Sequence, residues 1–310
     1  MGSGLRTPDN QRVLSELTRR ITLIGQDTLS GSAELSRQAR AVLADALQHG
    51  CAREIAVALV RAQPSMAPIW NAAISAIGSL SAPEAWNHAV RRWERADRAL
   101  ERVALPALTF DDTPPRQVVT FSMSGTVVRV LRKLAEASPH PLRVSCSEGR
   151  PALEGRQLAS ILHAEGIAVD FYTDAALGGV LEAADLLLLG ADAIGPTAWI
   201  NKAGTQSLVA AAHVRGLPVH VVTTSDKLVM PSLWPRLAVR HGPPAEVWDA
   251  PPAGIRVHNP YFESIPLDFV STVVTDVGVL GVDMVPSACA ALETPGTRRA
   301  LAELLAAFDV

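Results

Sequence analysis

The sequence predicts an α/β protein: a helical N-terminal domain, residues 1–110, followed by a Rossmann-like domain, residues 111–310, whose mostly parallel sheet has helices on both faces. The 310 residues suit two domains of roughly 150 residues each. The first hundred residues carry apolar side chains at helical spacing and no strand-like run. Beyond them, short β-rich runs alternate with helical patterns, which is typical of βαβ units.

The N-terminal helices follow from the spacing of their apolar residues. One helix is expected around residues 13–24, and a second begins after Ser32. A longer helix places Trp86, Trp93 and Leu100 at seven-residue steps. A stripe of this kind is typical of a helix that packs into a core, so we expect these side chains to be buried.

A turn-rich segment, residues 111–116, marks the expected domain boundary. After it, strands and helices are expected to alternate, with right-handed crossovers between parallel strands. The expected strands are residues 117–121, 142–147, 168–172, 186–190 and 218–223. The expected helices are residues 126–135, 153–165, 175–183 and 204–214, with a terminal helix at 297–308.

Composition and charge argue against several classes of protein. The net charge is −3, and no basic excess indicates nucleic acid. No segment resembles a signal peptide or is long and apolar enough to span a bilayer, so a cytoplasmic protein is expected. Cys51, Cys146 and Cys289 are far apart and odd in number, which suits reduced thiols rather than disulfides or a metal site. We expect no metal and no cofactor.

In an open parallel sheet, ligands bind past the carboxyl ends of the strands, so the residues after each strand matter most. Ser122 and Ser124 follow the first expected strand and open a helix, where hydroxyls and backbone N–H groups can hold an anion. The loop lacks the glycine patterns of dinucleotide-binding and Walker loops. A capped helix without a ligand is the alternative.

Charged residues follow the next strand. Arg150, beside Glu148, could hold a phosphate or carboxylate with two parallel hydrogen bonds. The alternative is a structural ion pair of Arg150 with Glu148 or Glu154.

Asp192 follows a nearly all-apolar strand. Burial there would raise the pKa of its carboxyl group and suit proton transfer, although Asp192 could instead cap the next turn. Asn201 and Lys202 precede another helix start. Lys202 could meet a substrate phosphate or the Asp192 carboxylate, or it could be a solvated surface lysine.

Several of these loops together resemble one family. The matching segments are residues 144–151, 154–159, 166–176, 190–194, 201–205, 258–263 and 273–278, with weaker similarity at 64–71. They resemble the family of ribose-1,5-bisphosphate isomerase, methylthioribose-1-phosphate isomerase and the alpha, beta and delta subunits of initiation factor 2B. Its enzymes convert a 1-phosphorylated aldose into the ketose.

The resemblance implies that Asp192 corresponds to the Asp these isomerases use, whereas their catalytic Cys falls on Ser122. Cys146 could substitute for that thiol, although a buried, inert thiol is the alternative. The isomerases also have an Arg-Gly-Ala phosphate motif. The corresponding segment of this sequence has no Arg, but Gly31 and Ser32 could supply backbone N–H groups there.

These observations favour a sugar-phosphate isomerase, with Asp192 and Ser122 as catalytic residues. The expected substrate-binding residues are Ser124, Glu148, Arg150, Asn201, Lys202, Gly31 and Ser32. A non-catalytic regulatory protein that binds a sugar phosphate or nucleotide is the alternative, and another enzyme using the same crevice is a third. The expected partners are a small phosphorylated sugar and a second copy of the chain, with no nucleic acid or membrane.

Overall fold

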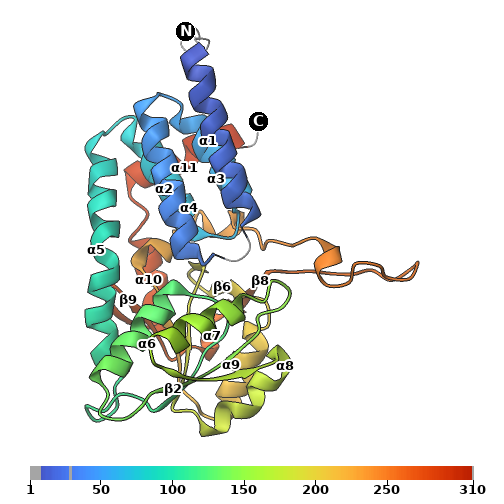
Figure 1. Ribbon diagram of the computed structural model, residues 1–310. Coiled ribbons are helices and arrows are strands. Elements are labelled where there is room, and N and C mark those ends of the chain that lie inside the picture. Colours follow the sequence, from blue (N-terminus) through green and yellow to red (C-terminus); the bar gives the residue numbers. More distant parts are fainter. Residues whose placement is uncertain (1–7, 28–29, 309–310) are drawn as a thin grey trace.

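The computed structural model describes residues 8–27 and 30–308. It confirms the expected fold class, because a helical N-terminal region is followed by a seven-stranded, mostly parallel sheet (Figure 1). No helix within these described ranges is both long and apolar enough to cross a membrane.

The N-terminal region is built from five helices, α1 (Pro8–Gln26), α2 (Ser32–Gln48), α3 (Ala52–Ala62), α4 (Ala67–Ser79) and α5 (Glu84–Ala107). Their apolar faces form one core, in which Leu35, Leu59 and Ile69 are fully buried. The C-terminal helix α11 (Pro295–Phe308) returns to this core through Leu301 and Leu304. Figure 1 shows α11 among the N-terminal helices, far along the chain from the elements it contacts.

The large sheet has the strand order β10-β9-β7-β4-β1-β2-β3. Its strands are β1 (Gln117–Val119), β2 (Arg143–Ser147), β3 (Ala168–Tyr172), β4 (Leu186–Leu189), β7 (Val219–Val222), β9 (Thr272–Thr275) and β10 (Gly278–Gly281). All pair in parallel except β10, which is antiparallel to β9. The five strands expected from the sequence are therefore present, each within two residues of its expected ends, while β9 and β10 were not expected.

Helices cover both faces of this sheet. One face packs against α5, α6 (Gly125–Ala137) and α7 (Glu154–Ala164). The other packs against the 3-10 helix η1 (Gly178–Ala183), α9 (Thr205–Val214) and α10 (Val285–Ala290), and the four-residue α8 (Asp174–Leu177) precedes η1.

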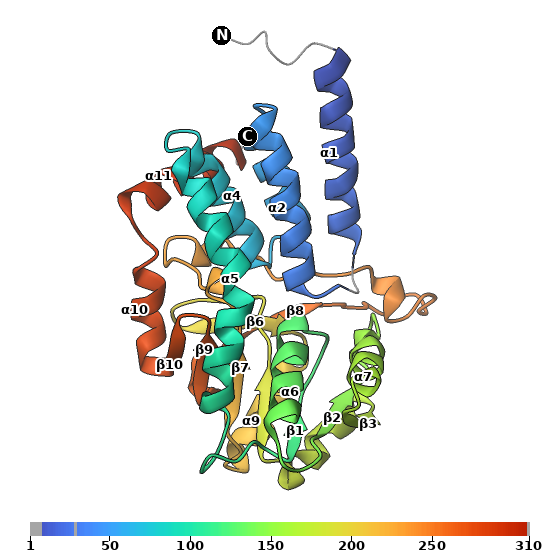
Figure 2. The same ribbon diagram turned by 60° about the vertical axis from the view of Figure 1, so that its left-hand side comes forward.

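Helix α5 joins the two parts of the molecule. Its 24 residues span about 36 Å, so it runs from the N-terminal helices down to the sheet (Figure 2). Trp93 and Leu100 are buried as expected. Trp86 is half-buried and packs against the core of the N-terminal helices, to which Trp93 also belongs.

A second, antiparallel sheet was not expected from the sequence. It has the order β5-β6-β8 and consists of β5 (Ala193–Ile194), β6 (Ala198–Lys202) and β8 (Phe262–Pro266). Within the segment between β7 and β8, residues from about 240 to 258 leave the body of the molecule as the orange arm of Figure 1 and return to it. The remaining 3-10 helices are η2 (Ser225–Lys227), η3 (Trp234–Arg236), η4 (Pro244–Glu246), η5 (Leu267–Phe269) and η6 (Val282–Met284).

Candidate functional site

The strand order of the large sheet reverses between β1 and β4, and the loops after these two strands line one cavity. This is the position at which open parallel sheets place their ligands. We call this cavity the crevice. Its walls also include the N-terminus of α2, the end of β6 and the segment that returns to β8. The lining residues that carry polar side chains are Asp27, Ser30, Ser32, Ser122, Ser124, Glu154, Asp192, Asn201, Lys202, Arg240 and Tyr261.

Asp192 lies in the crevice wall with its backbone fixed on both sides. Its N–H donates to the carbonyl oxygen of Ile200 at 2.9 Å, and its own carbonyl accepts from the N–H of Ala67 at 3.0 Å. The side chain is 9% exposed and accepts a hydrogen bond from the hydroxyl of Ser32. Asp192 thus joins β6 to the first residues of α2 and α4, so both parts of the molecule hold one carboxyl group in place.

Burial raises the pKa of the Asp192 carboxyl group above its ordinary value, because the charged form loses its hydration. The positive charge of Lys227, the hydrogen bond from Ser32 and the charge of Lys202 act in the opposite direction without cancelling the effect. Lys227 is itself 2% exposed, and its Nζ donates to the carbonyl oxygen of Ala191 at 2.5 Å. Burial lowers the pKa of Lys227. The arrangement favours a carboxyl group that can give up and regain a proton.

Ser122, Glu154 and Lys202 form a second polar group in the crevice. The hydroxyl of Ser122 donates to Oε1 of Glu154 at 2.9 Å, and Nζ of Lys202 lies 2.8 Å from the same oxygen. The Lys202 and Glu154 side chains are only 7% and 6% exposed. Oε2 of Glu154 is buried and has no hydrogen-bond partner among the described residues. A ligand hydroxyl could satisfy this acceptor.

Two helix N-termini meet at the crevice. Gly31 precedes α2, and Ser124 caps α6 by accepting a hydrogen bond from the N–H of Val127 at 3.3 Å. A Cβ on Gly31 would lie 3.3 Å from the carbonyl oxygen of Met123, so the two helix starts are in close contact. Figure 2 shows the lower end of α2 facing the upper end of α6. Converging N–H groups and helix dipoles favour an anion here.

The loops after β1 and β4 have backbone conformations that let them pack closely together. Ser122 has a φ of 67°, in the left-handed region that side chains other than glycine rarely adopt. Gly190 faces Ser124, and a Cβ there would lie 2.6 Å from the Ser124 hydroxyl oxygen. A side chain at position 190 would push the Ser124 side chain aside, so glycine allows the β1 and β4 loops to lie close together.

Arg240 brings a further positive charge from the arm. Its guanidinium donates to the carbonyl oxygen of Gly25 at 2.7 Å and to Oε1 of Gln63 at 3.0 Å. It also stacks on the ring of Tyr261, with Cζ 5.5 Å from the ring centroid. These contacts hold the guanidinium at the crevice. Gly31 and Ser32, in the segment where the isomerases have the Arg of their phosphate motif, line the same cavity.

Asn201 supports the loop that carries Lys202. Its amide donates to the hydroxyl oxygen of Thr205 at 3.0 Å, and that hydroxyl donates to the Lys202 carbonyl oxygen at 2.6 Å. Lys202 is 5% exposed, so it is not the solvated surface lysine that the sequence left open as an alternative.

Glu148 and Arg150 do not line the crevice. The Asp174 carboxylate accepts hydrogen bonds from the N–H groups of Gly149 and Arg150 at 2.8 and 2.7 Å, which fixes the turn of this loop. Arg150 is exposed, and its guanidinium donates to the carbonyl oxygen of Glu246 at 3.4 Å. The ion pair of Arg150 with Glu148 or Glu154 is not formed, because Glu154 pairs with Lys202 instead.

Cys146 does not reach the crevice either. It is fully buried in the apolar layer between the sheet and α6, and burial raises the pKa of its thiol to about 12. A thiol in this environment is a poor nucleophile. Within residues 8–27 and 30–308, no group of three His, Cys, Asp or Glu side chains is arranged to hold a metal ion.

Five polar residues that line the crevice, and Lys227 beside it, were missed from the sequence; the five are Asp27, Ser30, Glu154, Arg240 and Tyr261. Glu154 and Tyr261 lie within the family-like motifs, so those motifs could have identified them. Lys227 comes two residues after Ser225, which with Thr224 follows an expected strand. Charged residues so close to the end of a buried strand are candidates for a site, and this position could have identified Lys227. Arg240 lies in an irregular segment with no pattern around it, and no sequence signal points to it.

Known proteins resemble the chain over most of its length. Residues 53–282 match the model of the initiation factor 2 subunit family. A putative translation initiation factor eIF-2B subunit 2-like protein of Pyrococcus abyssi is 28% identical over 243 residues, which cover 77% of this chain and 84% of the relative. Ribose 1,5-bisphosphate isomerase of Archaeoglobus fulgidus is 28% identical over 174 residues, 54% of each chain.

The fold is also that of solved members. The crystal structure of the Pyrococcus horikoshii OT3 translation initiation factor eIF-2B superposes with a TM-score of 0.72 at 24% identity, covering 87% of this chain and 97% of that one. The family model covers well over half of the sequence. The chain belongs to the initiation factor 2 subunit family.

Proposed function

We propose that the crevice binds a 1-phosphorylated, ribose-type sugar and converts it to the ketose, with Asp192 as the proton-transfer group. The observation that carries the proposal is the buried, fixed Asp192 carboxyl group, which shares the crevice with Lys202 and two helix N-termini. Relatives with this activity match about half of the chain, which supports the same class of substrate.

The phosphate would sit where α2 and α6 begin. Two helix N-termini and the hydroxyls of Ser32 and Ser124 offer hydrogen bonds to an anion. Arg240 and Lys202 lie in the same cavity and would neutralise the charge. Arg240 thereby takes the part of the cation missing beside Gly31, from a segment far away in the sequence.

The reaction needs a group that can both give and take a proton. Asp192 in its neutral form, which burial favours, would donate a proton to the ring oxygen, and the bond between that oxygen and C1 would break. A hydride would then move from C2 to C1. The C2 hydroxyl would return a proton to Asp192, which restores the carboxyl group and leaves a ketone at C2.

Ser122 would act in hydrogen bonding rather than as a thiol-like acid. Its hydroxyl is oriented by Glu154, whose second oxygen is a buried acceptor open to a sugar hydroxyl. The pair could orient the sugar beside Asp192. Lys202 holds the Glu154 carboxylate in place through the 2.8 Å ion pair.

Phosphorus and proton NMR of the purified chain with ribose 1,5-bisphosphate, and separately with methylthioribose 1-phosphate, tests the proposal. Formation of the ketose from either sugar supports it. Calorimetric titration of the same sugars distinguishes the outcomes further, because binding without conversion would contradict the isomerase.

That outcome would favour the second candidate, a regulatory protein that binds a sugar phosphate or nucleotide without turnover. Ser122 at the position of the isomerases' Cys favours it, as does the eIF-2B-like name of the Pyrococcus abyssi relative. The Arg240→Gln variant serves both candidates, since it should weaken phosphate binding whether or not the sugar is converted.

We also propose that the protein is cytoplasmic.

We further propose that it forms a homodimer through its C-terminal part. The support for the dimer is an apolar surface at the antiparallel edge of the large sheet. Val277, Val279 and Met284 are 68%, 47% and 53% exposed there, on β10 and the turns beside it. Exposed apolar side chains gathered at a sheet edge are typical of an interface.

A further inference from the structure

A second cavity of about 400 Å³ lies between α2 and α5, and it shares no lining residue with the crevice. Its volume falls within the range of small-molecule sites, about 300–1,000 Å³. Arg40 and Arg37 of α2, Trp86 and Trp93 of α5, and Asp226 and Lys227 of η2 line it.

Small and aromatic side chains make up much of the wall. Ala33, Ala41 and Ala44 share one face of α2 through their spacing, and their small side chains do not fill the gap. Opposite them, the rings of Trp86 and Trp93 pack edge to face with centroids 5.6 Å apart. A planar ring fits between a wall of alanines and a wall of indoles.

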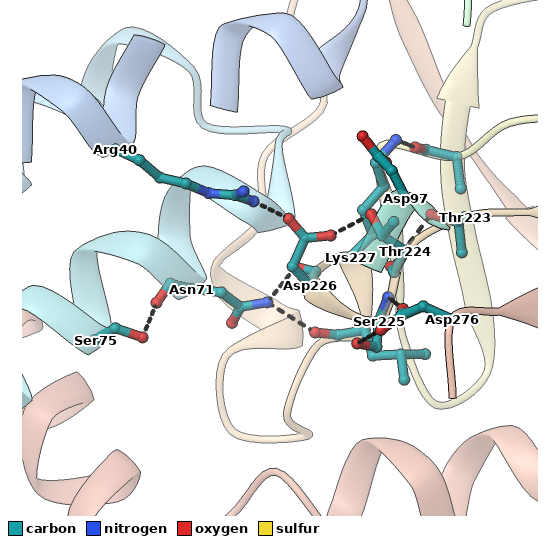
Figure 3. A network of polar contacts seen from close by, with 12 residues as sticks. Arg40, Asn71, Ser75, Asp97, Thr223, Thr224, Ser225, Asp226, Lys227 and Asp276 are labelled. Atoms are coloured by element: carbon teal, nitrogen blue, oxygen red, sulfur yellow. Dashed lines mark hydrogen bonds and ion pairs between the residues drawn. The ribbon is translucent and has the colours of Figure 1, made fainter. Parts of the chain in front are cut away.

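Arg40 links this cavity to the η2 turn. Figure 3 shows its guanidinium reaching Asp226, whose other oxygen accepts from the Thr224 hydroxyl at 2.5 Å. Asn71 of α4 holds the same turn by donating to the carbonyl oxygens of Asp226 and Leu228 at 2.7 and 2.9 Å (Figure 3). Arg40 Cζ lies 4.2 Å from the centroid of Trp93. The cation is therefore held in place against the indole wall.

The cavity wall has more donors than acceptors. Nε of Arg40 and Nε1 of Trp93 are buried, and neither finds an acceptor in the part of the chain that the structure describes. The nearby carboxylates are already engaged, since Asp226 pairs with Arg40 and Asp97 pairs with Arg129.

Two charged residues remain at the rim. Glu94 is exposed, so water and salt screen its charge. Arg37 pairs with Glu34 of its own helix, and 74% of its side chain is exposed, so its charge is screened in the same way, although the side chain can turn towards a ligand.

We propose that this cavity binds a planar aromatic carboxylate, with its ring against Trp86 and Trp93 and its carboxylate directed to Arg40 and Arg37. The ring would pack against Trp86 and the part of Trp93 that Arg40 leaves uncovered, and the carboxylate would supply an acceptor to the Arg40 guanidinium. The two cavities have different lining residues, although Lys227 in the wall of this one also contacts Ala191 beside the crevice, and the proposal does not depend on the isomerase.

Calorimetric titration of the whole chain with 2-naphthoate, and with the neutral 2-naphthamide as a matched probe, tests this site. We expect naphthoate to bind about tenfold or more tightly than the amide, because charge-assisted hydrogen bonds to arginine are lost with the amide. Equal binding of the two probes, or no binding of naphthoate, would overturn the proposal.

Variants locate the probe. Trp86→Ala and Arg37→Gln change half-buried and exposed positions, so we expect both to fold and each to weaken naphthoate binding several-fold. Arg19→Gln, which alters an exposed residue of α1, should leave it unchanged. Unchanged affinity in both cavity variants, or displacement of naphthoate by ribose 5-phosphate, would place the probe elsewhere and refute the site.

Discussion

Lys202 and Glu154 form an ion pair across the crevice, with Nζ 2.8 Å from Oε1 and both side chains less than one-tenth exposed. Lys202 ends β6 and Glu154 begins α7, so the pair joins the end of β6 to the loop after β2. Its charges are removed from water, and each depends on the other for compensation.

Removing one charge of this pair should destabilise the fold. For Glu154→Gln we expect a loss of about 3–5 kcal/mol in the free energy of unfolding, because Lys202 would stay buried without a partner. Urea denaturation followed by circular dichroism measures it. Arg53→Gln breaks the exposed pair with Glu303 and should change stability by about 1 kcal/mol at most. Equal effects of the two variants would mean that the crevice pair is well solvated.

Ser122 should separate function from stability. A glycine adopts its φ of 67° freely, and this gain offsets the lost hydrogen bond to Glu154, so Ser122→Gly should change the free energy of unfolding by no more than about 1 kcal/mol. The same change removes the hydroxyl that bonds Glu154, and turnover should fall at least tenfold. Thermal unfolding and the NMR assay measure the two effects. Turnover at the native rate would show that the hydroxyl has no part in the reaction.

Lys227 should set the pH dependence of Asp192. If turnover starts from the neutral carboxyl group, the rate falls as pH rises through the raised pKa of Asp192. The positive charge of Lys227 lowers that pKa, so Lys227→Met should raise it further and move the fall in rate to higher pH. Lys227→Arg keeps the charge and serves as the control. A pH profile of kcat that does not move in Lys227→Met would contradict this coupling.

The sheet edge should control the oligomeric state. Val277→Asp with Val279→Asp places two charges on the exposed apolar surface beside β10. Light scattering after gel filtration should report a dimer for the native chain and a monomer for the variant. Phe171→Asp, at another exposed apolar position, should remain dimeric. A native chain that is monomeric at micromolar concentration would refute the interface.

The sequence predicted the regular part of this fold well. Leu186 to Leu189 are four consecutive buried leucines, and such a run is recognisable as an interior parallel strand from sequence alone. Strand β9 is mostly buried but mixes Thr with Val, and β10 is a short edge strand with no buried residue, so neither was recognised. The small sheet was missed because β5 has only two residues, and β6 finds its antiparallel partner β8 some sixty residues further along the chain.

The crevice was predictable only in part, for a related reason. Ser122, Asp192 and Lys202 follow strands or precede helices, so topology places them at one end of the sheet. Arg240 and Lys227 reach the site through an irregular arm and a 3-10 turn, whose paths depend on tertiary packing. Arg150 looked equivalent to the crevice residues in sequence, but Asp174 holds its loop in a turn that leaves the side chain outside the lining.

The most direct test of the central claim is the conversion of ribose 1,5-bisphosphate by Asp192→Asn, compared with the native chain and with Asp268→Asn, an exposed control. Binding of the sugar should be measured on the same three samples. We expect the native chain and Asp268→Asn to form the ketose, and Asp192→Asn to bind the sugar with at least a thousandfold lower turnover, on the order of a lost proton-transfer group. Ketose formation by Asp192→Asn at the native rate would contradict the role of this carboxyl group.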